Sequence, residues 1–141
     1  MILLDTNVLS ALMRTEPDAV VVAWLDRQPR VSVWTTAVTV LEIRHGLALL
    51  PAGRRREVLA AGFAWLVDTL LDRRVAPFDA AAAERAAELL AARGRGGRPA
   101  ELRDTMIAGI AEACRATIAT ANIRHFGGLT VPVVDPWAAG G

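Results

Sequence analysis

The sequence predicts an α/β fold, a three-layer α/β/α sandwich in which a central parallel sheet of four or five strands lies between two layers of helices. Short β-like runs alternate along the chain with longer helical segments, a pattern typical of parallel strands joined by crossover helices. The length of 141 residues and the hydrophobic content of 53% suit one domain with a substantial core. In such sheets, ligands bind beyond the carboxyl ends of the strands. The residues that follow the strands are therefore the first candidates for a functional site.

Five runs have the apolar composition of buried strands. In chain order they are residues 2–5 (ILLD), 31–34 (VSVW), 74–78 (RVAPF), 117–120 (TIAT) and 129–134 (LTVPVV). Asp5 ends the first run and Asn122 follows the fourth run closely. Both residues are therefore expected at the carboxyl edge of the sheet.

Six segments have helical character. They are residues 7–14, 17–27, 36–50, 53–72, 79–93 and 99–115. Thr35 or Thr36, and Asp79, stand where a side chain caps the first turn of a helix. Pro51 separates the third helix from the fourth, and the glycine-rich turn at 94–99 ends the fifth.

The chain is expected to form one domain over residues 1–137, followed by a flexible tail at 138–141. Its single cysteine, Cys114, excludes an internal disulfide and a multi-cysteine metal site. No apolar run is long enough to span a membrane and no signal segment opens the sequence, so a cytoplasmic protein is expected. The net charge is +1, and all sixteen basic residues are arginines, whose planar guanidinium groups suit phosphate.

Three acidic residues lie in apolar surroundings, whereas most other acids lie among polar neighbours. Asp5 ends the first buried strand. Glu42 lies between Leu41 and Ile43 in a mostly apolar helix, and helical spacing places Asp104 on the same stripe as Ile107. Each of them alone could be a helix-capping residue, or a core acid whose oxygens are hydrogen-bonded within the protein. Three on separate elements favour a common site.

A cluster of carboxylates calls for a shared cation, because like charges raise each other's pKa. Oxygen ligands favour a hard divalent ion, and zinc is disfavoured because no pair of His or Cys residues has ligand spacing. Mg²⁺ or Mn²⁺ in such a site lowers the pKa of bound water and neutralises charge that grows on phosphorus. The acids therefore favour a metal-dependent enzyme that hydrolyses phosphodiester bonds.

Four blocks of the sequence resemble the PIN-domain ribonucleases in their order and spacing. They are residues 3–10 (LLDTNVLS), 36–59 (TAVTVLEIRHGLALLPAGRRREVL), 97–113 (GRPAELRDTMIAGIAEA) and 119–137 (ATANIRHFGGLTVPVVDPW). The chain resembles the VapC-type toxins of bacterial type II toxin–antitoxin pairs, particularly their FitB-like branch. This resemblance implies a PIN-like fold and a metal-dependent endoribonuclease that cleaves RNA to leave a 5′-phosphate and a 3′-hydroxyl.

The resemblance also implies roles for individual residues. Asp5, Glu42 and Asp104 would form the acidic triad around Mg²⁺ or Mn²⁺, with Asp5 and Asp104 as the most direct ligands. Asn122 occupies the fourth position of the family's site, where an amide ligates or orients water. Two residues depart from the family pattern: Ala121 stands where an Arg is usual, and His125 stands where an Asp is usual.

Several further residues have both a functional and a structural interpretation. The hydroxyls of Thr6 and Thr120 match positions near the metal in the family, or they are an N-cap and a strand end. His45 is expected to be an ordinary surface residue. The arginines that could attract a phosphate backbone, or form solvated faces, are Arg54, Arg55, Arg56, Arg93, Arg95 and Arg98. The apolar residues that could form an interface or belong to the core are Val20, Val21, Val22, Trp24, Phe63 and Trp65.

The resemblance implies a homodimer and a VapB-like antitoxin, whose segment would cross the site within a larger assembly. Aromatic residues are few, so selectivity for RNA is expected to come from its shape. Two alternatives stay open. A phosphatase of the haloacid-dehalogenase type also begins with an Asp after a strand, but it needs a second Asp where Asn7 stands and a Lys, which the chain lacks. A catalytically silent PIN-like binding module would tolerate the loss of Asp5.

Overall fold

The computed structural model describes residues 1–97 and 101–138 of the chain. Five parallel strands form one sheet in the order β3-β2-β1-β4-β5. The strands are β1 (Ile2–Leu4), β2 (Val33–Thr36), β3 (Val75–Ala76), β4 (Thr117–Ala119) and β5 (Val133–Val134). This arrangement confirms the expected α/β fold with a central parallel sheet.

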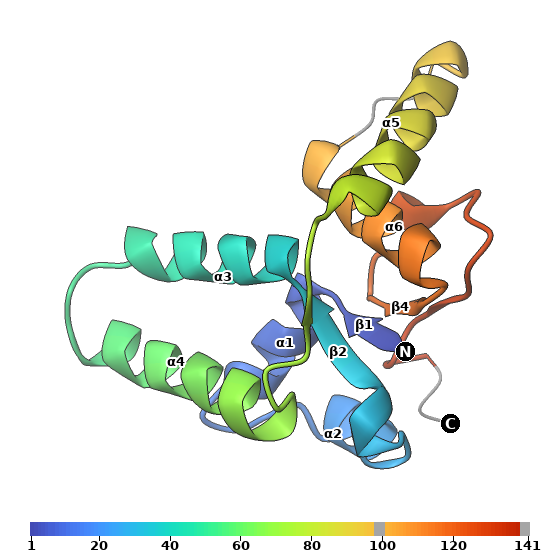
Figure 1. The fold of residues 1–141 in the computed structure, drawn as a ribbon. Coiled ribbons are helices and arrows are strands. Elements are labelled where there is room, and N and C mark those ends of the chain that lie inside the picture. Colours follow the sequence, from blue (N-terminus) through green and yellow to red (C-terminus); the bar gives the residue numbers. More distant parts are fainter. Residues whose placement is uncertain (98–100, 139–141) are drawn as a thin grey trace.

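Six α-helices surround the sheet in the described part of the chain. They are α1 (Thr6–Met13), α2 (Ala19–Asp26), α3 (Ala37–Leu49), α4 (Arg54–Trp65), α5 (Ala80–Arg95) and α6 (Leu102–Cys114). Figure 1 shows α5 and α6 lying together on one side of the sheet, away from α1, α2 and α4. None of the helices among the described residues is both long and apolar enough to cross a membrane.

Two hydrophobic cores lie on opposite faces of the sheet. Leu4 belongs to the core formed with α1 to α4, whereas its neighbour Leu3 belongs to the core formed with α5 and α6. Successive residues of a strand point to opposite faces, so this three-residue strand contributes to both layers. Both leucines are completely buried, at 0% and 1% exposure. The double burial explains why the first run of the sequence is apolar without alternation.

The predicted helix caps form in the structure. The hydroxyl of Thr36 accepts a hydrogen bond from the Thr39 backbone N–H at 3.0 Å, at the start of α3. The carboxylate of Asp79 accepts from the Ala82 N–H at 3.0 Å, at the start of α5. Each bond satisfies one of the unpaired donors in a first helical turn.

The second strand begins later than the sequence predicted. Residues 31–34 were the expected strand, but Arg30–Ser32 form a 3₁₀ turn and the strand covers Val33–Thr36. The guanidinium of Arg74 holds this turn by donating to the carbonyls of Val33 at 2.8 Å and Arg30 at 2.7 Å. The strand therefore ends at Thr36, and α3 starts directly at the carboxyl edge of the sheet.

Other elements also differ from their predicted extents, among them the third strand, which was expected over residues 74–78 but covers only Val75–Ala76. The fourth helix was expected to run through residues 53–72, but its last part, Leu66–Leu70, is a π-helix. The wider turn places Leu66, Leu70 and Leu71 in the core. The last strand was expected over residues 129–134 but covers only Val133–Val134, because Pro132 lacks the N–H that a longer ladder would need. Residues 139–141 of the predicted tail, and Arg98, lie outside the described residues.

Candidate active site

Asp5 lies where β1 passes into α1, and protein donors surround its carboxylate. The Oδ1 atom accepts from the Thr6 backbone N–H at 2.8 Å, which caps α1. The Oδ2 atom accepts from the Thr120 hydroxyl at 2.8 Å and from the Asn7 side-chain amide at 3.2 Å. These bonds compensate for the burial of a side chain that is only 5% exposed. Asp5 is therefore held in one orientation at the carboxyl edge.

Asn7 and Thr120 join the loop after β1 to the loop after β4. Asn7 donates to the Thr120 hydroxyl at 3.2 Å and accepts from the Ala121 backbone N–H at 2.9 Å. The Thr120 hydroxyl also accepts from the Asn122 backbone N–H at 3.0 Å. Thr120 is thus a buried connection between Asp5 and the loop that carries Asn122, which agrees with its predicted place beside the site.

Replacement of Thr120 by Val is expected to lower the free energy of unfolding by about 1–2 kcal/mol, because the isosteric side chain leaves buried polar partners unpaired. Thr120→Ser keeps the hydroxyl and is expected to lose much less. Urea denaturation of both variants measures the difference. Equal losses would mean that the methyl group of Thr120, and not its hydroxyl, carries the stability.

Glu42 reaches the same region from α3. Its Oε1 atom accepts a hydrogen bond from the Thr6 hydroxyl at 3.1 Å, so Thr6 orients this second carboxylate. Burial raises the pKa of Glu42, the Thr6 hydroxyl partly opposes that rise, and the negative charge of Asp5 adds to it. The ionised form of Glu42 is therefore costly without a cation nearby.

Asp104 lies in the first turn of α6. Glu101 caps this helix by accepting from the Asp104 backbone N–H at 2.8 Å, and that bond lowers the pKa of Glu101. Burial, together with the charges of Asp5 and Glu101, raises the pKa of Asp104. The imidazole of His125 opposes this effect, since its Nδ1 lies 2.9 Å from the Asp104 Oδ2 atom.

The three carboxylates line one pocket at the carboxyl edge of the sheet. Its lining consists of Asp5, Thr6, Asn7, Glu42, Glu101, Arg103, Asp104, Asn122 and His125. The structure therefore brings the predicted residues Asp5, Glu42, Asp104 and Asn122 together in one pocket, and their roles in a functional site stay predictions. Glu101, Asn7 and Arg103 were not anticipated as parts of it.

The carboxylates share the pocket without forming a tight cluster. As arranged, the described residues contain no group of three or more His, Cys, Asp or Glu side chains that could hold a metal ion. Simultaneous ligation by Asp5, Glu42 and Asp104 would therefore need a change of side-chain positions. The oxygen-only donor set and the raised pKa values of Glu42 and Asp104 nevertheless suit a divalent cation.

The other residues that the sequence singled out differ in their contacts and in their burial. Arg93 is engaged within the protein, because it donates to the Thr105 hydroxyl at 3.1 Å and to the His125 carbonyl at 3.3 Å. It therefore braces the segments that carry Asp104 and His125, in place of the free phosphate contact considered from sequence. His45 is exposed on α3, as expected. Buried core residues are Val21, Trp24 and Phe63, whereas Val20 and Trp65 are exposed.

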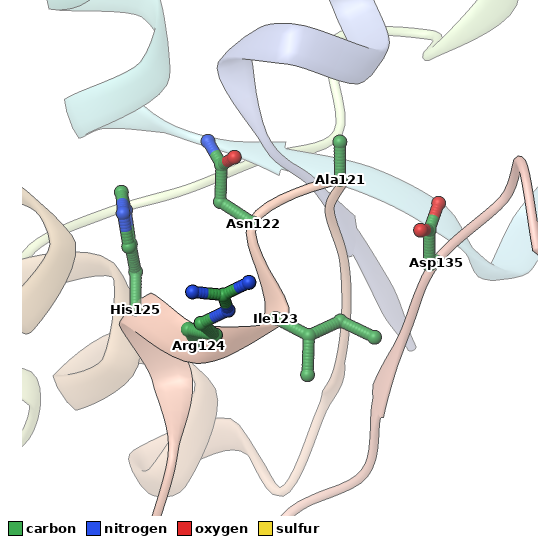
Figure 2. Close-up of a pocket in the computed structure, with 6 residues that line it drawn as sticks. All are labelled: Ala121, Asn122, Ile123, Arg124, His125 and Asp135. Atoms are coloured by element: carbon green, nitrogen blue, oxygen red, sulfur yellow. The ribbon is translucent and has the colours of Figure 1, made fainter.

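A second cavity adjoins the carboxylate pocket. Ala121, Asn122, Ile123, Arg124, His125 and Asp135 line it, and Figure 2 shows these side chains. Asn122 and His125 line both hollows, so the two are contiguous. Asp135 follows β5 directly, and the sequence prediction overlooked it although it stands immediately after a strand.

Comparisons with known proteins identify the family. Residues 2–127 match the model of the PIN domain. The chain is 38% identical to "VapC ribonuclease Y4jK" of Sinorhizobium fredii, over 97% of this chain and 98% of that protein. It is 36% identical to "Toxin FitB" of Neisseria gonorrhoeae, over 97% of this chain and 99% of that protein.

The fold comparison agrees with this sequence match. The crystal structure of FitAcB from Neisseria gonorrhoeae superposes with a TM-score of 0.86 at 36% identity, covering 97% of this chain and 99% of that chain. A VapBC complex from Salmonella typhimurium superposes with a TM-score of 0.76 at 24% identity, which shows a shared fold. From its sequence and its fold together, the chain belongs to the PIN domain family.

Proposed function

We propose that the chain is the toxin of a toxin–antitoxin pair and acts as a metal-dependent endoribonuclease in the bacterial cytoplasm. The convergence of Asp5, Glu42 and Asp104 on one pocket at the carboxyl edge carries this proposal. Relatives named "VapC ribonuclease Y4jK" and "tRNA(fMet)-specific endonuclease VapC" support RNA as the substrate. The relative named "Toxin FitB" supports the toxin role.

The oxygen donors of the pocket fit a hard divalent cation, which we propose to be Mg²⁺ or Mn²⁺. Asp5 and Asp104 would ligate it directly, and Glu42 would hold the ion or its water. When bound, the cation supplies an activated water and neutralises charge on the scissile phosphate. Thr6 and Thr120 orient Glu42 and Asp5 through their hydroxyls. The Asn122 amide would offer a neutral donor and acceptor to a phosphate bound in this pocket.

The proposed partners are an RNA substrate and a VapB-like antitoxin, with a homodimer of this chain in the complex. A largely apolar groove favours the proposal of a bound antitoxin segment. It runs from Thr6 and Glu42 to Leu47, Leu50 and Leu59. A segment bound there would reach the carboxylate pocket and block it. The similar solved structures are named FitAcB and VapBC-1, and each name combines two proteins, which supports a two-component complex.

Chelation tests the proposed mechanism. The purified chain is expected to cleave RNA with Mg²⁺ or Mn²⁺, to stop when EDTA is added, and to resume when the ion is restored. The products should carry a 5′-phosphate and a 3′-hydroxyl, and single-stranded DNA of the same sequence should stay intact. Cleavage that persists in EDTA would contradict metal dependence.

The same experiment separates the alternatives. RNA that is bound but never cut, with or without metal, would favour a catalytically silent binding module. The phosphatase alternative is disfavoured by the family and by Asn7, whose amide is occupied with Asp5, Thr120 and Ala121. A side-chain amide has no proton that dissociates near neutral pH, so Asn7 cannot serve as the general acid of that reaction.

A further inference from the structure

We propose that the cavity between Asn122 and Asp135 holds the nucleobase next to the scissile bond, and that Asp135 selects guanine there. This inference rests on the proposed nuclease function and specifies its substrate. It concerns the second cavity, which the acidic triad does not line.

The topology of the sheet places this cavity beside the carboxylate pocket. The strands β1, β4 and β5 are neighbours in the sheet. Asp5 directly follows β1, Asn122 lies in the loop after β4, and Asp135 directly follows β5. Parallel strands end at one edge, so the two hollows are adjacent positions along that edge. They share Asn122 and His125 as walls. An RNA strand whose phosphate lies in the carboxylate pocket would therefore place a flanking nucleotide in the second cavity.

The lining offers separate contacts for each part of a nucleotide. Ile123 is 44% exposed and supplies an apolar surface for the face of a base. Arg124 is exposed and supplies a guanidinium group for a phosphate. Figure 2 shows Asp135 on the opposite side of the hollow from His125. Among the described residues, neither Arg124 nor Asp135 has an ion-pair partner, so both charges are available to a ligand.

Asp135 is fixed in place while one of its oxygens stays available. Its Oδ1 atom accepts from the Trp137 backbone N–H at 2.9 Å. Trp137 is itself held by the hydrogen bond from its indole N–H to Asp18 at 3.0 Å. The Oδ2 atom of Asp135 has no donor within the described part of the chain. A fixed, half-buried acceptor of this kind discriminates among partners by their donors.

Guanine matches this lining better than uracil does. Its Watson–Crick edge presents two adjacent donors, an imino N–H and an exocyclic amino group. The Oδ2 atom of Asp135 and the remaining lone pair of Oδ1 can accept from both. The O6 atom of guanine can then accept from the Asn122 amide. Uracil instead presents a carbonyl on each side of its single N–H, and the carboxylate repels both. The cavity should therefore favour guanine over uracil.

Mapping of cleavage ends on RNA with randomised sequence tests the proposal. The wild type is expected to enrich guanine at one position next to the cut, and Asp135→Asn is expected to reduce that enrichment about tenfold. The variant keeps an oxygen for the Trp137 N–H, so it should fold. Asp26→Asn makes the same charge change on the exposed end of α2 and should leave the base profile unchanged.

A substrate comparison distinguishes base reading from a general loss. With Asp135→Asn, kcat/KM is expected to fall for RNA with guanine at that position and to stay unchanged for the matched uracil RNA. Arg124→Gln should instead raise KM for both RNAs and weaken the salt dependence of binding. A wild type without base preference, or a preference that Asp135→Asn leaves intact, would overturn the proposal.

Nucleotide binding keeps the proposal testable if the chain cuts no RNA. Guanosine 5′-monophosphate is expected to bind the wild type more tightly than uridine 5′-monophosphate in calorimetry, and Asp135→Asn should remove the difference. That result without any cleavage would contradict the proposed nuclease and retain the guanine site. Cleavage with equal binding of both nucleotides would contradict only the guanine site.

Discussion

Replacement of Asp104 by Asn is expected to reduce RNA cleavage by at least about 100-fold while making the protein more stable near pH 7. The carboxylate is one of the three that line the pocket, and its loss removes a charged oxygen ligand for the proposed metal. The amide keeps the volume of the side chain and an oxygen that can accept from His125. The loss of activity would therefore follow from charge and not from packing.

The stability gain follows from the raised pKa of Asp104. Burial, and the charges of Asp5 and Glu101, disfavour its ionised form in the folded protein. A carboxyl group whose folded pKa is raised binds more protons when folded, so its contribution to stability falls as pH rises from the ordinary aspartate pKa of about 4 through the folded pKa. Asn carries no such charge. The advantage of Asp104→Asn should be largest at neutral pH and vanish below the unfolded pKa.

Urea denaturation without divalent ions, compared near pH 7 and near pH 3.5, measures this difference. Asp26→Asn is a matched control, because this exposed acid lies on α2 outside the pocket. A variant that cleaves RNA as fast as the wild type would contradict the catalytic role of Asp104. A variant that is inactive but less stable at neutral pH would mean that His125 stabilises the ionised carboxylate more than burial destabilises it.

The central parallel sheet could be predicted because its first strand is buried on both faces. Leu3 and Leu4 show the reason, since they enter different cores from adjacent positions and leave no polar residue in the run. The boundaries of β2 could not be predicted. They depend on Arg74, which lies about forty positions away and holds the turn at Arg30 by hydrogen bonds to carbonyls. Local composition contains no information about such a contact.

The acids of the site could be predicted for a related reason. A carboxylate in an apolar stretch is expensive to bury, so Asp5, Glu42 and Asp104 were conspicuous against their neighbours. The contacts that orient them could not be predicted. The resemblance singled out Thr120 and His125 by their positions, but it did not indicate that Thr120 contacts Asp5 at 2.8 Å or that His125 contacts Asp104 at 2.9 Å. Those contacts exist only after distant segments have come together.

Arg93 shows why charge alone misled the prediction. In sequence it belongs to a basic, glycine-rich segment that suits a phosphate backbone. In the structure α5 continues to Arg95, so Arg93 lies within this helix. From there its guanidinium donates to the Thr105 hydroxyl and the His125 carbonyl. The close packing of α5 on α6 thus supports the segments on which the site depends.

Replacement of Gly109 by Ala is expected to lower the free energy of unfolding by about 2 kcal/mol. A Cβ atom at this position in α6 would lie 2.5 Å from the Ala82 carbonyl oxygen and 2.9 Å from the Ala86 Cβ atom. Both neighbours belong to α5, and a backbone carbonyl cannot move without its helix. Overpacking of this kind costs up to about 3 kcal/mol, which the better helix propensity of Ala offsets by about 1 kcal/mol.

Gly46→Ala is the matched control, since Gly46 lies inside α3 with nothing within 4 Å of an added Cβ atom. It is expected to stabilise the protein by about 0.5–1 kcal/mol, so the same chemical change should give opposite signs in two helices. Thermal unfolding should show a melting temperature lowered by about 6 °C for Gly109→Ala. Equal effects in both variants would mean that α5 moves along α6 at little cost. The bracing of Thr105 and His125 by Arg93 could then not be rigid, and the orientation of Asp104 would depend on α6 alone.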